Sequence, residues 1–165
     1  MNADAIRHFY EYHFAENRKL WDSYLPSLSD EQFTQHVDYS IGSVRNQMVH
    51  LMSCDNYWFS ALIRAEFPDM FNPADFKDRE AIRSKWDKIE QSQREYLASL
   101  TDDILMERPF TGEDDVLYLW QVLLHVVSHG IDHRAQILRI IHDLGVETGP
   151  QDYIFYTFEN LWTPS

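Results

Sequence analysis

The feature that most constrains the fold is an apolar periodicity of three and four residues, which recurs in four long stretches separated by proline or glycine. This spacing places apolar side chains on one face of a helix. The stretches run from about Asp4 to Leu25, from Ser43 to Phe67, from Asp78 to Leu100 and from about Asp115 to Leu144. No segment alternates apolar and polar residues for long enough to predict a sheet. The sequence therefore predicts an all-α four-helix bundle with at least one long crossover connection.

Local signals predict where these helices begin and end. Ser43 and Asp78 are expected N-caps, and Gly145 is an expected C-terminal cap. The segment from Ser29 to Gln32 reads as a capping box that opens a short extra helix. The segment after Pro150 is rich in aromatic residues and is expected to pack against the bundle; these residues are Tyr153, Phe155, Tyr156, Phe158 and Trp162.

Length and charge limit the class of protein. A chain of 165 residues suits one domain, residues 1–165, and its net charge of −13 disfavours binding to nucleic acid or anionic membranes. Cys54 is the only cysteine, so the chain has no internal disulfide. The sequence shows neither a signal peptide nor a stretch of membrane-spanning length, so we expect a cytoplasmic protein.

The chemistry is concentrated in the fourth stretch, where His125, His129 and His133 are spaced four residues apart. Eight histidines in the chain make this spacing a weak signal by itself. The neighbouring apolar residues are more informative, because His129 and His133 share their helix face with valines and isoleucines. His125 lies between this face and the polar face. The pattern predicts that two histidines point inward and that His125 is displaced toward solvent.

Two inward-facing imidazoles one turn apart need a physical reason. Protonating both would be costly in the core, and hydrogen bonds alone satisfy two neutral rings poorly. A metal ion satisfies them, because neutral imidazole is a common metal ligand and this spacing suits it. One helix readily offers two ligands, so a third should come from another helix. His50, at the edge of the inner face of the second stretch, is the best candidate.

These segments together resemble the DinB/YfiT-like family of metal-binding four-helix bundles over nearly the whole chain. The resemblance is carried by residues 12–18 (YHFAENR), by 42–44 (GSV) with 48–50 (MVH), Asp55 and Trp58, by 125–136 (HVVSHGIDHRAQ), and by Gly145 with 150–154 (PQDYI). Asp132 stands where the family usually has a second histidine, and Ala135 stands where it has glycine. The resemblance implies that His50, His129 and His133 are the metal ligands.

Three protein ligands leave open positions on a metal, as in catalytic sites. The centre is expected to hold one divalent ion, with zinc or nickel the ions to be found. The resemblance implies a metal-dependent thiol S-transferase, because characterised relatives use low-molecular-weight thiols, and its partner would be a small-molecule substrate. Two alternatives stay open: a metal-dependent hydrolase, or a non-catalytic, stress-related protein that binds a metal or ligand.

Several polar residues near these positions have more than one interpretation. For His13 and Cys54, packing is preferred over a role beside the metal or as a soft ligand. Asp55 could anchor the helices or support the metal ligands, and both readings stay open. For His125 a boundary position is preferred to ligation, and for Arg134 a solvated or interhelical ion pair is preferred to substrate binding.

The fourth stretch also suggests an assembly. Its apolar residues span roughly 220° of the helix circumference, more than a bundle helix usually needs. A monomer with a central fourth helix would account for this. A twofold homodimer is the preferred interpretation, because aromatic residues are plentiful and the family resemblance implies frequent homodimers.

Overall fold

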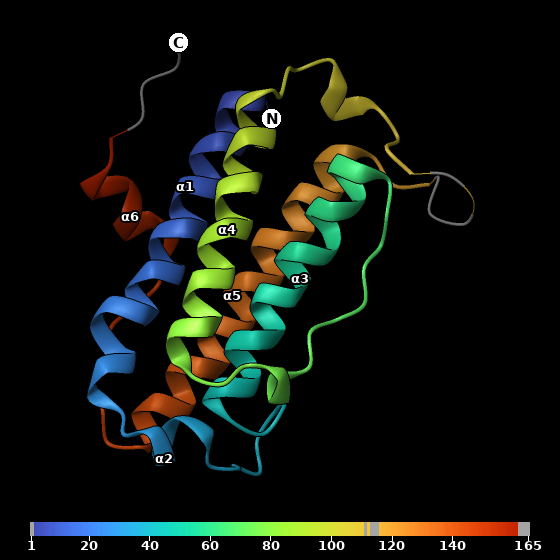
Figure 1. Ribbon diagram of the computed structural model, residues 1–165. Coiled ribbons are helices and arrows are strands. Elements are labelled where there is room, and N and C mark those ends of the chain that lie inside the picture. Colours follow the sequence, from blue (N-terminus) through green and yellow to red (C-terminus); the bar gives the residue numbers. More distant parts are fainter. Residues whose placement is uncertain (1, 111, 113–115, 162–165) are drawn as a thin grey trace.

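Four long helices build the computed structural model, which describes residues 2–110, 112 and 116–161 (Figure 1). They are α1 (Ala3–Lys19), α3 (Val44–Arg64), α4 (Arg79–Ala98) and α5 (Leu119–Asp143). Two short α-helices are also present: α2 (Asp30–Thr34) precedes α3, and α6 (Tyr153–Glu159) follows α5. The described residues contain no strand. The predicted all-α bundle is confirmed.

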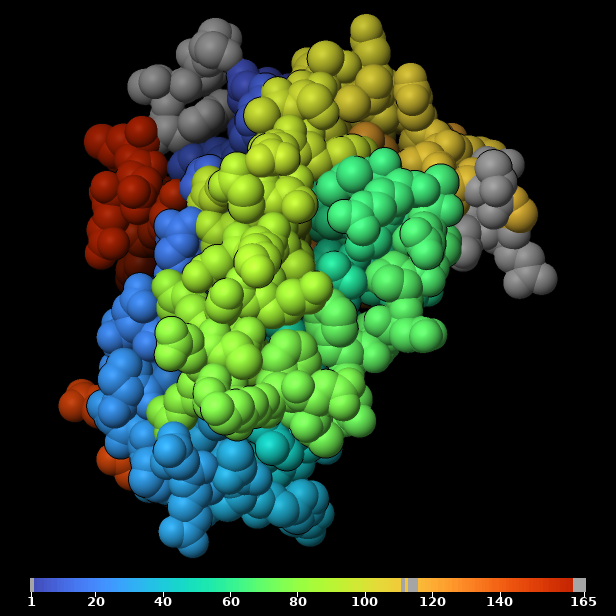
Figure 2. Space-filling model, in the orientation of Figure 1, coloured from blue at the N-terminus to red at the C-terminus, as the bar shows by residue number. Residues whose placement is uncertain are grey.

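The order of the helices in space differs from their order in sequence. α3 packs against α4 and α5, and α1 also packs against α4 and α5. α3 and α4 run in the same direction, so residues 65–78 must return along the length of the bundle (Figure 1). Figure 2 shows this connection lying on the surface beside α4. It is the long crossover that the sequence predicted.

Most of the predicted helix ends are found in the structure. The Ser43 hydroxyl accepts from the backbone of Asn46, and the Asp78 carboxylate accepts from that of Ala81. The capping box between Ser29 and Gln32 is also formed. Gly145 has a φ of +90°, the left-handed conformation expected after a helix.

Two boundaries differ from the prediction, and the last part of the first helix has another geometry. α3 ends at Arg64 rather than near Phe67, because Ala65 adopts a left-handed conformation with a φ of +55°. The first helix continues beyond Lys19 as a π-helix over Leu20–Tyr24, just before Pro26, which cannot donate a backbone hydrogen bond. The fourth helix begins at Leu119, and its predicted start near Asp115 falls outside the described residues.

The C-terminal segment packs on one face only. Tyr153 and Tyr156 of α6 contact aromatic rings of α1, including Phe9 and Tyr12. Phe155 and Phe158 are 49% and 69% exposed, so the expectation that the whole aromatic segment packs down is wrong for these residues. Trp162 lies outside the described residues.

The wide apolar surface of α5 is used within one chain. Val127 is buried, and three partly buried residues pack against the same core; these are Trp120, Leu124 and Ile131. α5 therefore occupies a central position in the bundle. None of the described helices has the length and apolarity needed to cross a bilayer.

Candidate metal centre

Three histidines meet where α3 faces α5. His50 comes from α3, and His129 and His133 are one turn apart on α5. Their ring centroids are 4.3 Å apart for His129 and His133, 4.5 Å for His50 and His133, and 5.3 Å for His50 and His129. One potential ligand atom from each residue lies within 4.8 Å of the other two. The structure thus brings together the three histidines singled out in the sequence.

The protonation of these rings suits metal binding. Each histidine is partly buried, and burial is the main cause that lowers all three pKa values. The effect is largest for His129, whose pKa falls to about 4 because burial is reinforced by His133, His50 and His125. The rings are therefore neutral near pH 7, and neutral imidazole is the form that binds a metal.

Gln47 orients one of the three rings. Its side chain is fully buried, and its Oε1 lies 2.8 Å from Nδ1 of His133. A carbonyl oxygen only accepts, so Nδ1 of His133 carries the proton and Nε2 keeps the lone pair. Gln136 accepts in turn from Nε2 of Gln47 at 3.1 Å and from the Ser40 hydroxyl. This support was not predicted, although Gln47 precedes His50 by three residues and so shares its helix face.

Cys54 lies beside the histidine cluster. Its Sγ is 3.6 Å from Nε2 of His50 and 3.7 Å from Nε2 of His129. Burial, with a smaller contribution from Asp55, raises the pKa of its thiol to about 12. The thiol is partly buried and faces two imidazole nitrogens, which simple apolar packing does not explain.

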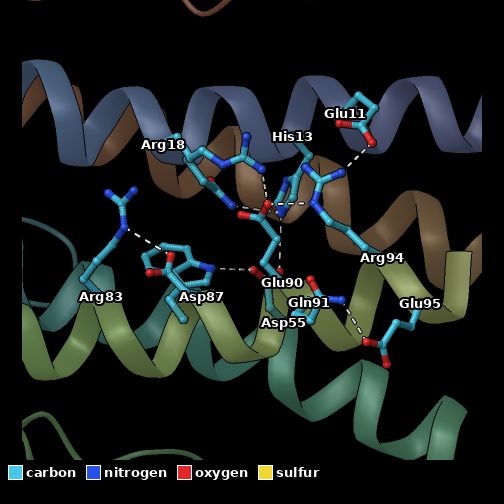
Figure 3. Close-up of polar contacts among 12 residues, drawn as sticks. Glu11, His13, Arg18, Asp55, Arg83, Asp87, Glu90, Gln91, Arg94 and Glu95 are labelled. Atoms are coloured by element: carbon cyan, nitrogen blue, oxygen red, sulfur yellow. Dashed lines mark hydrogen bonds and ion pairs between the residues drawn. The ribbon is translucent and has the colours of Figure 1, made fainter.

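A second cluster of polar residues lies in the bundle interior, next to the histidine cluster. His13 of α1, Asp55 of α3 and Arg134 of α5 are each at most 2% exposed. Nη1 of Arg134 donates to Nδ1 of His13 at 3.1 Å and to Oδ1 of Asn17 at 2.8 Å. Nδ1 of His13 is therefore an acceptor, and Nε2 of the same ring lies 3.1 Å from Nδ2 of Asn17. Nε2 faces a carboxylate oxygen of Asp55 at 3.5 Å (Figure 3).

This buried network changes two interpretations. Arg134 is buried rather than solvated, and it forms no direct ion pair with any residue that the structure describes; it reaches Asp55 through His13. His13 is a hydrogen-bonded bridge rather than a packed ring, and burial is the main cause that lowers its pKa and keeps it neutral. Asp55 also accepts from the indole N–H of Trp86 at 3.2 Å, so this carboxylate anchors α3 to α1 and α4. Anchoring of the helices was one of the two interpretations that the sequence allowed for Asp55.

Gly130 allows this network to form. A Cβ atom at this position would lie 2.5 Å from Cε1 of His13 and 3.0 Å from Nη1 of Arg134. Only a residue without a side chain lets the His13 ring approach the backbone of α5 so closely. This role of Gly130 was not predicted; the signal available in the sequence was a glycine within a long helix, directly after His129.

Aromatic residues lie next to the histidine cluster on the side of His125. His125 is exposed, as predicted, and its ring lies 5.7 Å from that of His129 and 5.3 Å from that of Trp58. Trp58 in turn contacts Phe67 and Phe110. A small molecule that reaches the histidines from this side would contact both imidazole and apolar aromatic surface.

Comparison with known proteins agrees with this architecture. The chain is similar to Protein DinB of Bacillus subtilis (strain 168), with 23% identity over 166 residues that cover 94% of this chain and 95% of that protein. The model of the DinB family matches residues 1–163. With this match over nearly its entire length, the chain belongs to the DinB family.

Proposed function

We propose that this protein is a metal-dependent enzyme of the thiol S-transferase type. The observation that supports this proposal is the cluster of three neutral imidazoles from two helices, which leaves positions free on a bound divalent ion. A metal held there would lower the pKa of a coordinated thiol, which makes sulfur nucleophilic at neutral pH. The thiol-transfer chemistry itself rests on the family resemblance.

The residues of the chain have distinct tasks in this proposal. His50, His129 and His133 hold the ion, and Gln47 fixes the ring of His133. Trp58 and its aromatic neighbours contact an apolar acceptor beside the cluster. The thiol sulfur forms a bond to an electrophilic carbon of this acceptor. The leaving group departs with its electron pair, and the proton of the thiol goes to solvent.

The first test measures metal content. Purified protein is stripped, reloaded with zinc and assayed by elemental analysis, together with the variants His129→Ala and His133→Ala. Both variants should lose stoichiometric zinc, whereas His125→Ala, a matched control on the same helix, should retain it. Full zinc content in both variants would show that the ligand assignment is wrong.

The second test is a conjugation screen on the zinc-loaded protein, with several low-molecular-weight thiols and electrophiles. We expect thiol consumption that depends on zinc and is absent in His129→Ala. If zinc binds stoichiometrically but no thiol is consumed across the panel, the metal centre stands and the transferase activity is refuted.

A further inference from the structure

Cys54 is positioned one helical turn after His50, on the side of α3 that faces α5. Its sulfur adjoins two of the three clustered histidines, and it contacts both through Nε2. Because Nδ1 of His133 donates to Gln47, the nitrogen of that ring with a lone pair for a metal is also Nε2. The thiol thus faces nitrogen atoms of two of the three histidines that could hold the ion.

The spacing can be compared with that of a real coordination shell. Zinc–nitrogen bonds are about 2.1 Å and zinc–sulfur bonds about 2.3 Å, so a tetrahedral shell separates sulfur from nitrogen by about 3.6 Å. The observed distances from Sγ of Cys54 to His50 and His129 are 3.6 and 3.7 Å. Sulfur therefore lies where a tetrahedral edge would place it relative to both of these nitrogens.

We propose that Cys54 is a fourth protein ligand, bound as thiolate, of the ion held by His50, His129 and His133. On binding, the sulfur forms a bond to the ion and its proton is released to solvent. Thiolate is a soft ligand, so this donor favours zinc and cobalt over harder ions such as magnesium. The inference rests on the metal centre of the proposed function but does not depend on thiol transfer. With Cys54 bound, a substrate thiol would enter as a fifth ligand, because a zinc site can expand to five-coordinate during a reaction.

Cobalt(II) provides a test that does not use activity. The protein is loaded with cobalt in thiol-free, anaerobic buffer, and its absorption spectrum is compared with that of Cys54→Ser. The wild type should show visible d–d bands together with a near-ultraviolet sulfur-to-cobalt charge-transfer band. Cys54→Ser should keep the visible bands and lose the charge-transfer band, while the matched control His125→Ala should keep both.

A measurement on the wild type alone covers the case in which Cys54→Ser does not fold. Because the chain has one cysteine, a thiol reagent reports on Cys54 only. Zinc should protect this one thiol equivalent from the reagent, and X-ray absorption of the zinc protein should show a sulfur neighbour at about 2.3 Å.

The outcomes separate the two proposals. Visible cobalt bands without a charge-transfer band, or a thiol that reacts equally fast with and without zinc, would overturn ligation by Cys54 and leave the histidine centre intact. A wild type that gives no visible cobalt bands at all would overturn the metal centre, and the role of Cys54 with it.

Discussion

Gly130→Ala tests whether the buried network fixes α5 against α1. In an exposed helix this substitution stabilises a protein by up to about 1 kcal/mol, because alanine is the better helix former. Here the added Cβ would lie 2.5 Å from Cε1 and 2.7 Å from Nδ1 of His13, whereas carbon atoms normally stay about 3.5–4.0 Å apart. The ring must therefore move by roughly 1 Å. His13 is fully buried, so it has no free space into which to move.

The magnitude follows from two costs and one gain. Overpacking a core costs about 1–3 kcal/mol. Weakening the buried hydrogen bond between His13 and Arg134, in which the donor is charged, costs about 1.5–3 kcal/mol. After the helix-propensity gain of about 1 kcal/mol, the free energy of unfolding should fall by about 1.5–5 kcal/mol. For a chain of this size the melting temperature should then fall by roughly 3–20 °C.

The assay is urea denaturation of the metal-free protein, with a double-mutant cycle. In a His13→Ala background the contacts with the ring are absent, and only the 3.0 Å contact with Nη1 of Arg134, at the end of a flexible side chain, remains. Gly130→Ala should therefore destabilise this background much less than it destabilises the wild type. Ser128→Ala, at an exposed position of the same helix, should change stability by less than about 0.5 kcal/mol. A Gly130→Ala variant that is as stable as the wild type, or an equal loss in both backgrounds, would refute the role assigned to His13.

Three further predictions concern the metal centre and assembly. Gln47→Ala should weaken zinc binding by about 10- to 100-fold in a competition with a chromophoric chelator, because the His133 ring loses its orientation; unchanged affinity would contradict this. In the metal-free protein the lowered pKa of His129 means that the unfolded chain binds more protons below about pH 6.5, so stability should decline as the pH falls from there to about 4. His129→Gln should flatten that decline, and an unchanged slope in urea titrations would count against it. Sedimentation equilibrium at micromolar concentration should show a homodimer that covers exposed aromatic residues such as Phe155 and Phe158, because the apolar surface of α5 is already covered within one chain; a single species of 19.7 kDa would exclude it.

The fold was predictable because its signals are local. Apolar spacing identified all four long helices, and side-chain caps such as Ser43 and Asp78 fixed where two of them begin. Ends without such signals were placed less well. The left-handed turn at Ala65 uses a residue that does not favour this conformation, so the C-terminus of α3 could not be read from its sequence.

The site was predictable from the sequence for those of its residues that lie on one helix, α5. Angular position along α5 separated His129 and His133 from the exposed His125. The same geometry could not assign Arg134, because a long charged side chain is usually solvated and its burial depends on partners from another helix. Those partners, His13 and Asn17, are more than a hundred residues away in sequence.

The histidine cluster and the buried polar network are linked because their residues are neighbours in sequence on α3 and on α5. One step along an α-helix rotates the side-chain direction by about 100°. The residue that follows a member of the histidine cluster, or Cys54 beside it, therefore points in another direction, here toward His13. On α5, Arg134 follows His133, and on α3, Asp55 follows Cys54; both inward residues meet His13. Sliding α3 relative to α5 by one turn would take Asp55 or Arg134 away from His13 and leave a buried polar group without its partner, which destabilises the fold. The network therefore fixes the register of the two helices, and this register places His50 opposite His129 and His133.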